Sequence, residues 1–226
     1  MASAMSGKEK KHTASKQFTE LAGTPILIHT LRKFTASNEV SEIYVALRAN
    51  EMEGFRERLK EAPDLAGTKI QAVEGGEHRQ QSVAHAIAAV SAGPDDIVLV
   101  HDAVRPFVTA EIIREVIEGA KKYGAAIAGV PAVDTVKRVE RTSEGALITA
   151  TVPRERVVLA QTPQGFRYSV LKKAFDEAAA DGFIGTDEAS LVERSGHEVA
   201  VVMGAARNIK ITTPGDLELA EFYLKS

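Results

Sequence analysis

The stretch IVLVHDAVRP, residues 97–106, sets the fold class of this chain of 226 residues. Its first four residues are apolar and largely β-branched, as is typical of a strand covered on both faces. Polar residues follow at once, and Asp102 and Arg105 are among them. In open α/β sheets, ligands bind just beyond the carboxyl ends of the strands, so both side chains are well placed for chemistry.

Two interpretations of this cluster are open. Asp102 can hold Mg²⁺ or a ligand hydroxyl, because a hard cation prefers carboxylate oxygen and keeps ligand phosphates and waters as its other ligands. Arg105 can hold a phosphate with its fixed fork of donors. An Asp–Arg pair that closes a surface turn explains the same two residues equally well.

Short apolar runs alternate with helical patterns on both sides of this stretch. Strands are predicted at 43–47, 70–73, 97–100, 125–130 and 199–202. Helices are predicted at about 79–92, 109–122, 168–181, 187–195 and 214–225. Another helix is predicted after Thr24 and Pro25, which suit an N-cap and a first helical position. This order predicts an α/β fold with a mostly parallel sheet.

One segment interrupts the alternation. Residues 135–139 and 147–152 have strand-like patterns and are separated by a polar turn at 142–145, which predicts a β-hairpin. We expect an arm at about 134–157 that protrudes from the sheet. A long hairpin of this kind often meets a partner subunit.

The composition is that of an ordinary globular protein, with 44% hydrophobic and 26% charged residues. The absence of cysteine excludes disulfides, thiolate metal sites and cysteine nucleophiles. A net charge of −3 gives no basic field, so we expect no nucleic-acid partner. No long apolar run or signal-like core occurs, so we expect no membrane association and a cytoplasmic location. Residues 16–226 are expected to form a single domain, preceded by a mobile polar segment at 1–15.

The glycine-containing segment GGEHRQQS, residues 75–82, stands between a predicted strand and a predicted helix. Paired glycines let a ligand approach the backbone closely, and the helix N-terminus behind them favours an anion or a polar base edge. A purely structural turn is the commoner explanation of such a segment.

Other polar residues suit phosphate binding but have simpler explanations. Thr135 begins the hairpin, and Arg154 and Thr162 follow it. These side chains can donate to phosphate, yet on a hairpin they could equally form a solvated face. Thr186 and Asp187 stand where they can cap the helix that follows them.

Two lysines occupy ambiguous positions. Lys210 lies between β-branched residues at a strand end, ahead of a helix begun by Pro214, and Lys16 lies in SKQF. Either lysine could serve phosphate chemistry or could snorkel to solvent. None of the six histidines has the paired spacing of a metal site or an obvious Ser/Asp partner, so a hydrolase triad is not supported.

Eight ordered segments together resemble the 2-C-methyl-D-erythritol 4-phosphate cytidylyltransferase family. The resemblance runs from Lys16 to the C-terminus and is highly specific because the segments keep both their order and their spacing. The segments are KQF (16–18), GTPILIHTL (23–31), GGEHRQQSV (75–83), VHDAVRPF (100–107), DTVKR (134–138), QTPQGF (161–166), TDEASLVE (186–193) and NIKITTPGDLELAE (208–221).

The resemblance implies a Rossmann-like, three-layer nucleotidyltransferase domain and a defined reaction. The phosphate of methylerythritol phosphate would attack the α-phosphorus of CTP, with Mg²⁺ bridging the CTP phosphates and pyrophosphate leaving. It also implies a homodimer, in which the hairpin arm crosses to the second subunit and completes its site.

The resemblance further implies roles for residues at the matching positions. Lys16 and Lys210 would be the charge-stabilising catalytic lysines, and Asp102 would also serve the metal. Residues around the cytosine would be Gly76, Glu77 and Ser82. Residues lining the ribose, metal and acceptor region would be Asp102, Arg105, Thr135, Arg154, Thr162 and Thr186.

The chain departs from the family's pattern before Lys16. The family opens with an apolar strand, a glycine-rich loop and an arginine, whereas residues 1–15 read MASAMSGKEKKHTAS. We therefore expect a longer native product, and an open slot in the sheet where that strand would pair. Two other functions are also considered: a cytidylyltransferase for another polyol phosphate, such as ribitol 5-phosphate, and a non-catalytic nucleotide-binding protein.

Overall fold

The central sheet of the computed structural model, which describes residues 15–225, has four strands in the order β10-β6-β9-β5. These are β5 (Ile97–Val100), β6 (Ala125–Pro131), β9 (Val158–Arg167) and β10 (Ala200–Met203). Strand β10 is parallel to β6, whereas β9 is antiparallel to both β6 and β5. A second, two-stranded parallel sheet pairs β3 (Glu42–Leu47) with β4 (Lys69–Glu74).

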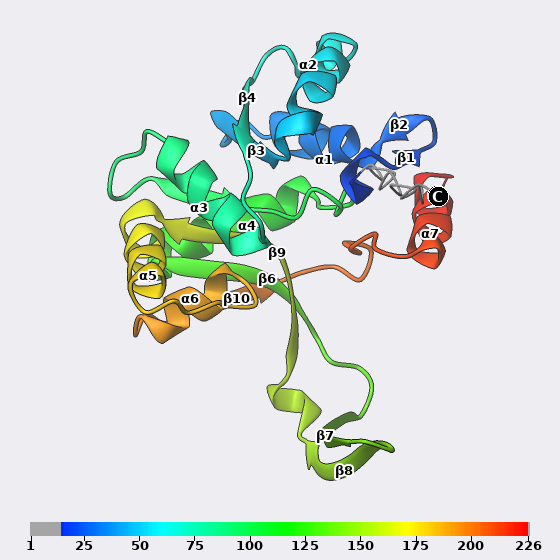
Figure 1. The fold of residues 1–226 in the computed structure, drawn as a ribbon, viewed down its shortest axis with the longest axis vertical. Coiled ribbons are helices and arrows are strands. Elements are labelled where there is room, and N and C mark those ends of the chain that lie inside the picture. The colour runs from blue at the N-terminus through cyan, green and yellow to red at the C-terminus, as the bar shows by residue number, and fades with distance from the viewer. Residues whose placement is uncertain (1–14, 226) are drawn as a thin grey trace, which may run out of the picture.

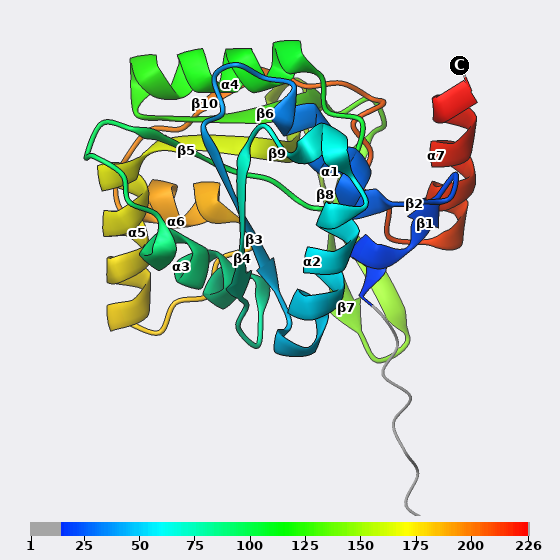
Figure 2. The same ribbon diagram turned by 90° about the horizontal axis from the view of Figure 1, so that it is seen from above.

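Helices cover both faces of the central sheet (Figures 1 and 2). One face packs against α4 (Ala110–Tyr123) around the buried Ile113, and the other packs against α5 (Tyr168–Ala180) and α6 (Glu188–Arg194) around the buried Phe166. The remaining helices are α1 (Ile26–Thr35), α2 (Met52–Lys60), α3 (Arg79–Ala89) and α7 (Pro214–Lys225). The three-layer α/β architecture expected from the sequence is confirmed.

Short 3-10 helices join several of these elements. They lie at Lys16–Phe18, Ala49–Glu51, Pro63–Leu65 and Arg154–Arg156.

A β-hairpin arm projects from the layered body, as Figure 1 shows. It consists of β7 (Val136–Thr142) and β8 (Gly145–Val152), which pair in antiparallel register. Most of its residues are exposed, including Leu147 and Ile148, which are 65% and 66% exposed. The predicted hairpin therefore forms and exposes large apolar side chains near its tip.

The central sheet differs from the predicted, mostly parallel one because it contains β9, which runs antiparallel to both of its neighbours. The sequence analysis places Thr162 after the hairpin and predicts no strand there. Pro163 and Gly165 are unusual inside a strand, so local pattern gives little sign of β9. The chain leaves the sheet on β6, runs through the arm and returns on β9, so the returning strand has to run in the opposite direction.

The predicted start of the first helix was also wrong. Thr24 and Pro25 form a short strand, β2 (Thr24–Pro25), which pairs with β1 (Glu20–Leu21), and α1 begins only at Ile26. Ala22 and Gly23 connect the two strands with positive φ angles of 51° and 76°, as a tight hairpin turn requires. Helix α2 was not predicted, because it is rich in charged residues and Phe55 is its only buried residue.

Within the described residues, β3 pairs only with β4, and β5, at the edge of the central sheet, pairs only with β9. The expectations for residues 1–14 fall outside the part of the chain that the structure describes. Among residues 15–225, no helix is both long enough and apolar enough to cross a membrane.

Candidate active site

Three cationic side chains meet at Asp102, just beyond the carboxyl end of β5. Arg79 Nε lies 3.3 Å from Asp102 Oδ1. Lys210 Nζ and Arg105 Nε lie 3.0 Å and 3.4 Å from the other carboxylate oxygen, Oδ2. Burial raises the pKa of Asp102, but the charges of Arg79 and Lys210 outweigh it and hold the pKa below its ordinary value. The site thus carries an excess of positive charge around one ionised carboxylate.

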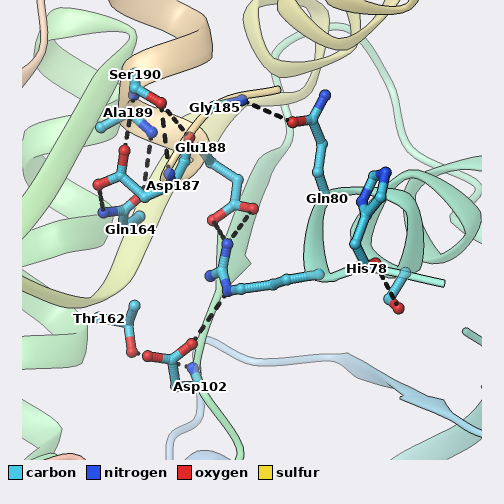
Figure 3. A network of polar contacts seen from close by, with 12 residues as sticks. His78, Gln80, Asp102, Thr162, Gln164, Gly185, Asp187, Glu188, Ala189 and Ser190 are labelled. Carbon is cyan, nitrogen blue, oxygen red and sulfur yellow. Dashed lines mark hydrogen bonds and ion pairs between the residues drawn. The ribbon is translucent and has the colours of Figure 1, made fainter. Parts of the chain in front are cut away.

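Arg79 is held in place by a second carboxylate, that of Glu188 (Figure 3). Its Nη1 donates to both oxygens of Glu188, at 2.6 Å and 2.8 Å. The Glu188 side chain is 1% exposed, and burial raises its pKa in spite of the guanidinium beside it. Arg79 begins α3 and Glu188 begins α6, so this ion pair joins the first turns of two helices.

Strand β9 contributes Thr162 to the same place. The Asp102 backbone N–H donates to the Thr162 hydroxyl at 3.0 Å, and the same hydroxyl lies 3.1 Å from His101 Nδ1. The other ring nitrogen of His101 lies 3.0 Å from the carbonyl oxygen of Arg105. Burial lowers the pKa of His101 to about 4, so the ring is neutral near pH 7.

The loop that carries Lys210 is fastened to β9 and to Arg105. Asn208 is fully buried, and its amide donates to Gln161 Oε1 at 3.2 Å and to the Thr162 carbonyl at 2.9 Å. Arg105 Nη1 donates to the Asn208 carbonyl at 2.7 Å. These bonds set the position of Lys210, two residues further along.

Lys16 also contacts the loop that carries Lys210. Its Nζ donates to the Thr212 carbonyl at 2.8 Å. The Asp216 carboxylate accepts from the backbone N–H groups of Thr212 and Thr213 at 2.9 Å and 2.8 Å. These hydrogen bonds lower the pKa of Asp216 to about 2 and fix the turn before α7.

The glycine-containing segment forms a turn at the start of α3. The Gly76 N–H donates to the Ser82 hydroxyl at 3.0 Å, and that hydroxyl donates to the His78 carbonyl at 3.1 Å. The Glu77 N–H donates to Gln81 Oε1 at 2.9 Å, and the Glu77 side chain is exposed. The polar groups of this turn therefore bond to one another, as the structural interpretation of the segment expects.

The remaining predicted residues do not take part in the Asp102 cluster. Thr135 and Arg154 lie at the base of the arm and are exposed, and Arg154 Nη1 donates to the Val133 carbonyl at 2.7 Å. Thr186 is exposed, and the capping role belongs to Asp187, whose carboxylate accepts from the Ser190 N–H at 2.9 Å.

Sequence reasoning missed Arg79 and Glu188 as parts of the site. Both stood inside the quoted segments, yet they were interpreted only as members of a glycine turn and of a helix start. One signal pointed to Glu188. It begins a helix whose Ala189, Leu191 and Val192 are apolar, so its side chain is expected to be buried, and a buried acid needs a cationic partner.

The described residues do not form a metal cage of their own. No group of three or more His, Cys, Asp or Glu side chains suited to a metal occurs within residues 15–225. At the site, Asp102 can offer a cation one carboxylate, and its two oxygens already face three cationic groups. A divalent ion would therefore need most of its ligands from a bound phosphate compound and from water.

Comparisons with known proteins give one consistent result. The family model described as IspD, 2-C-methyl-D-erythritol 4-phosphate cytidylyltransferase, matches residues 1–226. The protein of that name from Acidobacterium capsulatum is 58% identical over 210 residues, which are 93% of this chain and 87% of the relative. Its counterpart from Solibacter usitatus is 52% identical over 218 residues, which are 96% of this chain and 88% of the relative.

Solved structures agree with these sequence matches. The crystal structure of the Francisella tularensis 2-C-methyl-D-erythritol 4-phosphate cytidylyltransferase superposes with a TM-score of 0.78 at 36% identity, covering 92% of this chain and 93% of that one. The enzyme of the same name from Thermus thermophilus gives a TM-score of 0.73 at 33% identity, covering 93% and 94%.

Proposed function

This chain belongs to the 2-C-methyl-D-erythritol 4-phosphate cytidylyltransferase family, and we propose that the cationic cluster around Asp102 is where it performs the family's reaction. The enzyme transfers a cytidylyl group from CTP to 2-C-methyl-D-erythritol 4-phosphate in the non-mevalonate isoprenoid pathway. An oxygen of the acceptor's phosphate forms a bond to the α-phosphorus, the bond to the β-phosphate breaks, and pyrophosphate leaves. The products are 4-diphosphocytidyl-2-C-methyl-D-erythritol and pyrophosphate.

The observation that carries this assignment is the excess of positive charge around Asp102. Transfer at phosphorus is accelerated mainly by positioning and by cations that offset charge on the pentacoordinate phosphate. We assign that role to Lys210, which contacts Asp102, and to Lys16, whose Nζ donates to the Thr212 carbonyl in the same loop. Arg105, held by Asp102 and by the Asn208 carbonyl, presents its remaining donors to a phosphate.

We assign the nucleotide to the turn between β4 and α3. There, Gly76 and Ser82 offer a backbone N–H and a hydroxyl that now bond to each other, and Glu77 is exposed beside them. A cytosine edge would exchange these internal bonds for its own. Asp102 and Thr162 lie at the end of β5 and would meet the ribose.

Mg²⁺ is assigned to the triphosphate of CTP. The donor set fits an ion that keeps phosphate and water oxygens and takes at most one oxygen from Asp102. When bound, Mg²⁺ neutralises phosphate charge and orients the leaving pyrophosphate. The residues themselves orient the triphosphate and supply the fixed positive charges.

We assign the arm to the interface of a homodimer, where it reaches the site of the partner chain. Thr135 and Arg154 lie away from the Asp102 cluster in their own chain and would meet the acceptor bound to the partner, together with Thr186 of that site. The exposed Leu147 and Ile148 give the arm an apolar surface that a second copy can cover. We place the enzyme in the cytoplasm, where CTP and Mg²⁺ are both available.

Pyrophosphate release tests the function. The 226-residue chain is incubated with CTP, Mg²⁺ and 2-C-methyl-D-erythritol 4-phosphate, beside reactions that lack the acceptor or contain ribitol 5-phosphate instead. Release that requires the methylerythritol acceptor supports the proposal. Tight CTP binding by folded protein without any release would contradict it.

A further inference from the structure

If Lys210 takes part in the reaction, its ammonium group has to interact with two anions, the Asp102 carboxylate and a substrate phosphate. In the structure its Nζ lies 3.0 Å from Asp102 Oδ2, so its charge is engaged by a carboxylate. To stabilise a phosphate it has to loosen that contact, and an uncompensated, largely buried Asp102 would oppose the change. Some other group must keep Asp102 paired.

Two arginines meet that need. Arg79 Nε contacts Asp102 Oδ1 and Arg105 Nε contacts Oδ2, so each carboxylate oxygen keeps a guanidinium partner when Lys210 moves away. Arg105 is fixed from its other side by the Asn208 carbonyl. Arg79 projects from the first turn of α3, and its side chain is 37% exposed, so it needs an anchor.

Glu188 is that anchor. Both of its oxygens accept from Arg79 Nη1, which leaves Nε directed at Asp102. Glu188 is itself immobilised, because it begins a helix whose Ala189, Leu191 and Val192 are buried. Figure 3 shows the Glu188 carboxylate and Asp102 joined by dashed lines through one guanidinium group.

We propose that Glu188 is a positioning residue that holds Arg79 against Asp102, so that Lys210 can exchange the Asp102 carboxylate for a substrate phosphate. The inference rests on the proposed function, because it assigns Lys210 to phosphate. Without the Glu188 charge, Arg79 would leave Asp102 more easily, and Asp102 would hold Lys210 more tightly.

A double-mutant cycle between Glu188 and Lys210 tests this coupling. Glu188→Gln keeps the shape of the side chain and removes its charge. We expect kcat/KM for CTP to fall roughly tenfold, the scale of one charge-assisted hydrogen bond. In a Lys210→Met background the same substitution should change kcat/KM less than twofold, because the lysine it acts through is gone.

Controls separate positioning from general structural damage. Glu193→Gln changes an exposed acid on the same helix and should leave kcat/KM unchanged. If Glu188→Gln does not fold, Arg79→Lys provides a second route, since it keeps the charge but cannot contact both carboxylates as a fork, and the same non-additivity is expected.

The outcomes are distinguishable. Additive losses in the two backgrounds, or a loss that follows the melting temperature, would overturn the positioning role while leaving the function in place. An active enzyme in which Lys210→Met alone has no effect would overturn both this inference and the role given to Lys210. Absence of pyrophosphate release by the unsubstituted chain would instead concern the proposed function itself.

Discussion

Asp102 has more cationic partners than one carboxylate can neutralise, and this excess determines what each neighbouring side chain contributes. Lys210 and Arg79 are partly exposed at the cluster, with 42% and 37% of their side chains accessible. Exposed ion pairs add little to stability, typically about 0–1 kcal/mol. Under the proposed function these charges act on a bound phosphate, so substitutions here should separate activity from stability.

Lys210→Ala is the first such substitution. We expect kcat to fall by about 10²–10³, the usual effect of removing one preorganised donor to a charged transition state. The melting temperature should change little. Steady-state pyrophosphate release and a thermal melt measure the two effects, with Lys172→Ala as the control, because that lysine also forms an exposed ion pair, at 2.6 Å from Asp176. Equal losses of stability and activity would remove Lys210 from the reaction.

His101 gives the fold a pH dependence of definite sign. Its pKa is lowered from 6.5 to about 4 by burial, so the unfolded chain binds a proton between these values while the folded chain does not. Stability is therefore full above about pH 6.5 and falls as the pH drops toward 4, by up to about 3 kcal/mol. Urea unfolding from pH 7 to pH 4 should show this loss in excess of that in His101→Asn. Parallel curves for the two proteins would contradict the assignment.

Individual site residues were predictable to different degrees. Asp102 and Arg105 could be found as candidates because they directly follow an apolar strand, although an Asp–Arg pair that closes a turn explained them equally well. Lys16 and Lys210 were ambiguous from local pattern and gained roles only from the resemblance. Arg79 and Glu188 were not found, because they are 109 residues apart and only the packing of α3 near α6 brings them together.

The elements were predictable where apolar periodicity was clean. Strands β3, β4, β5, β6 and β10 and most helices lie within about two residues of their predicted bounds, the usual uncertainty at element ends. Strand β9 was missed because its core contains proline and glycine. Close packing against α4 and β5, rather than a turn, requires the glycine of this strand, Gly165.

Gly165→Ala should destabilise the fold. A Cβ at this position would lie 2.7 Å from Val116 Cγ1 and 2.9 Å from Leu99 Cδ2, between α4 and β5. Overpacking of this kind typically costs about 1–3 kcal/mol. The matched control is Gly54→Ala in α2, where a Cβ meets nothing within 4 Å and where alanine should add about 0.5–1 kcal/mol. Urea titration of both variants measures the difference, and equal stability would show that β9 can shift to accept the methyl group.

Arg154, at the base of the arm, is expected to contact the acceptor. Arg154→Ala should raise the KM for the methylerythritol acceptor by roughly tenfold, because one charge-assisted contact to phosphate is lost. The affinity for CTP, measured by calorimetry, should stay the same. Arg141→Ala, nearer the tip of the arm and also exposed, is the control. An unchanged KM and kcat would exclude Arg154 from the acceptor site.

The direction in which the arm projects determines the assembly that we expect. Figure 1 shows the arm pointing away from the body. Arg154 follows β8 and donates to the Val133 carbonyl, so we do not expect it to serve the site of its own chain. In a two-fold dimer the arm of each chain would instead reach the site of its partner. Each complete site would then contain Lys210 from one chain and Arg154 from the other.

Mixed dimers test this arrangement directly. Arg154→Ala and Lys210→Ala chains are unfolded together, refolded and assayed with the acceptor well below its KM. A mixed dimer has one site with both residues intact and one site with neither, so random pairing should restore about a quarter of the unsubstituted activity. Refolding Arg154→Ala chains with chains that carry both substitutions cannot build an intact site and is the control. If the mixture only averages the activities of the two variants, Arg154 acts within its own chain or not at all, and the arm has to be assigned a purely structural role.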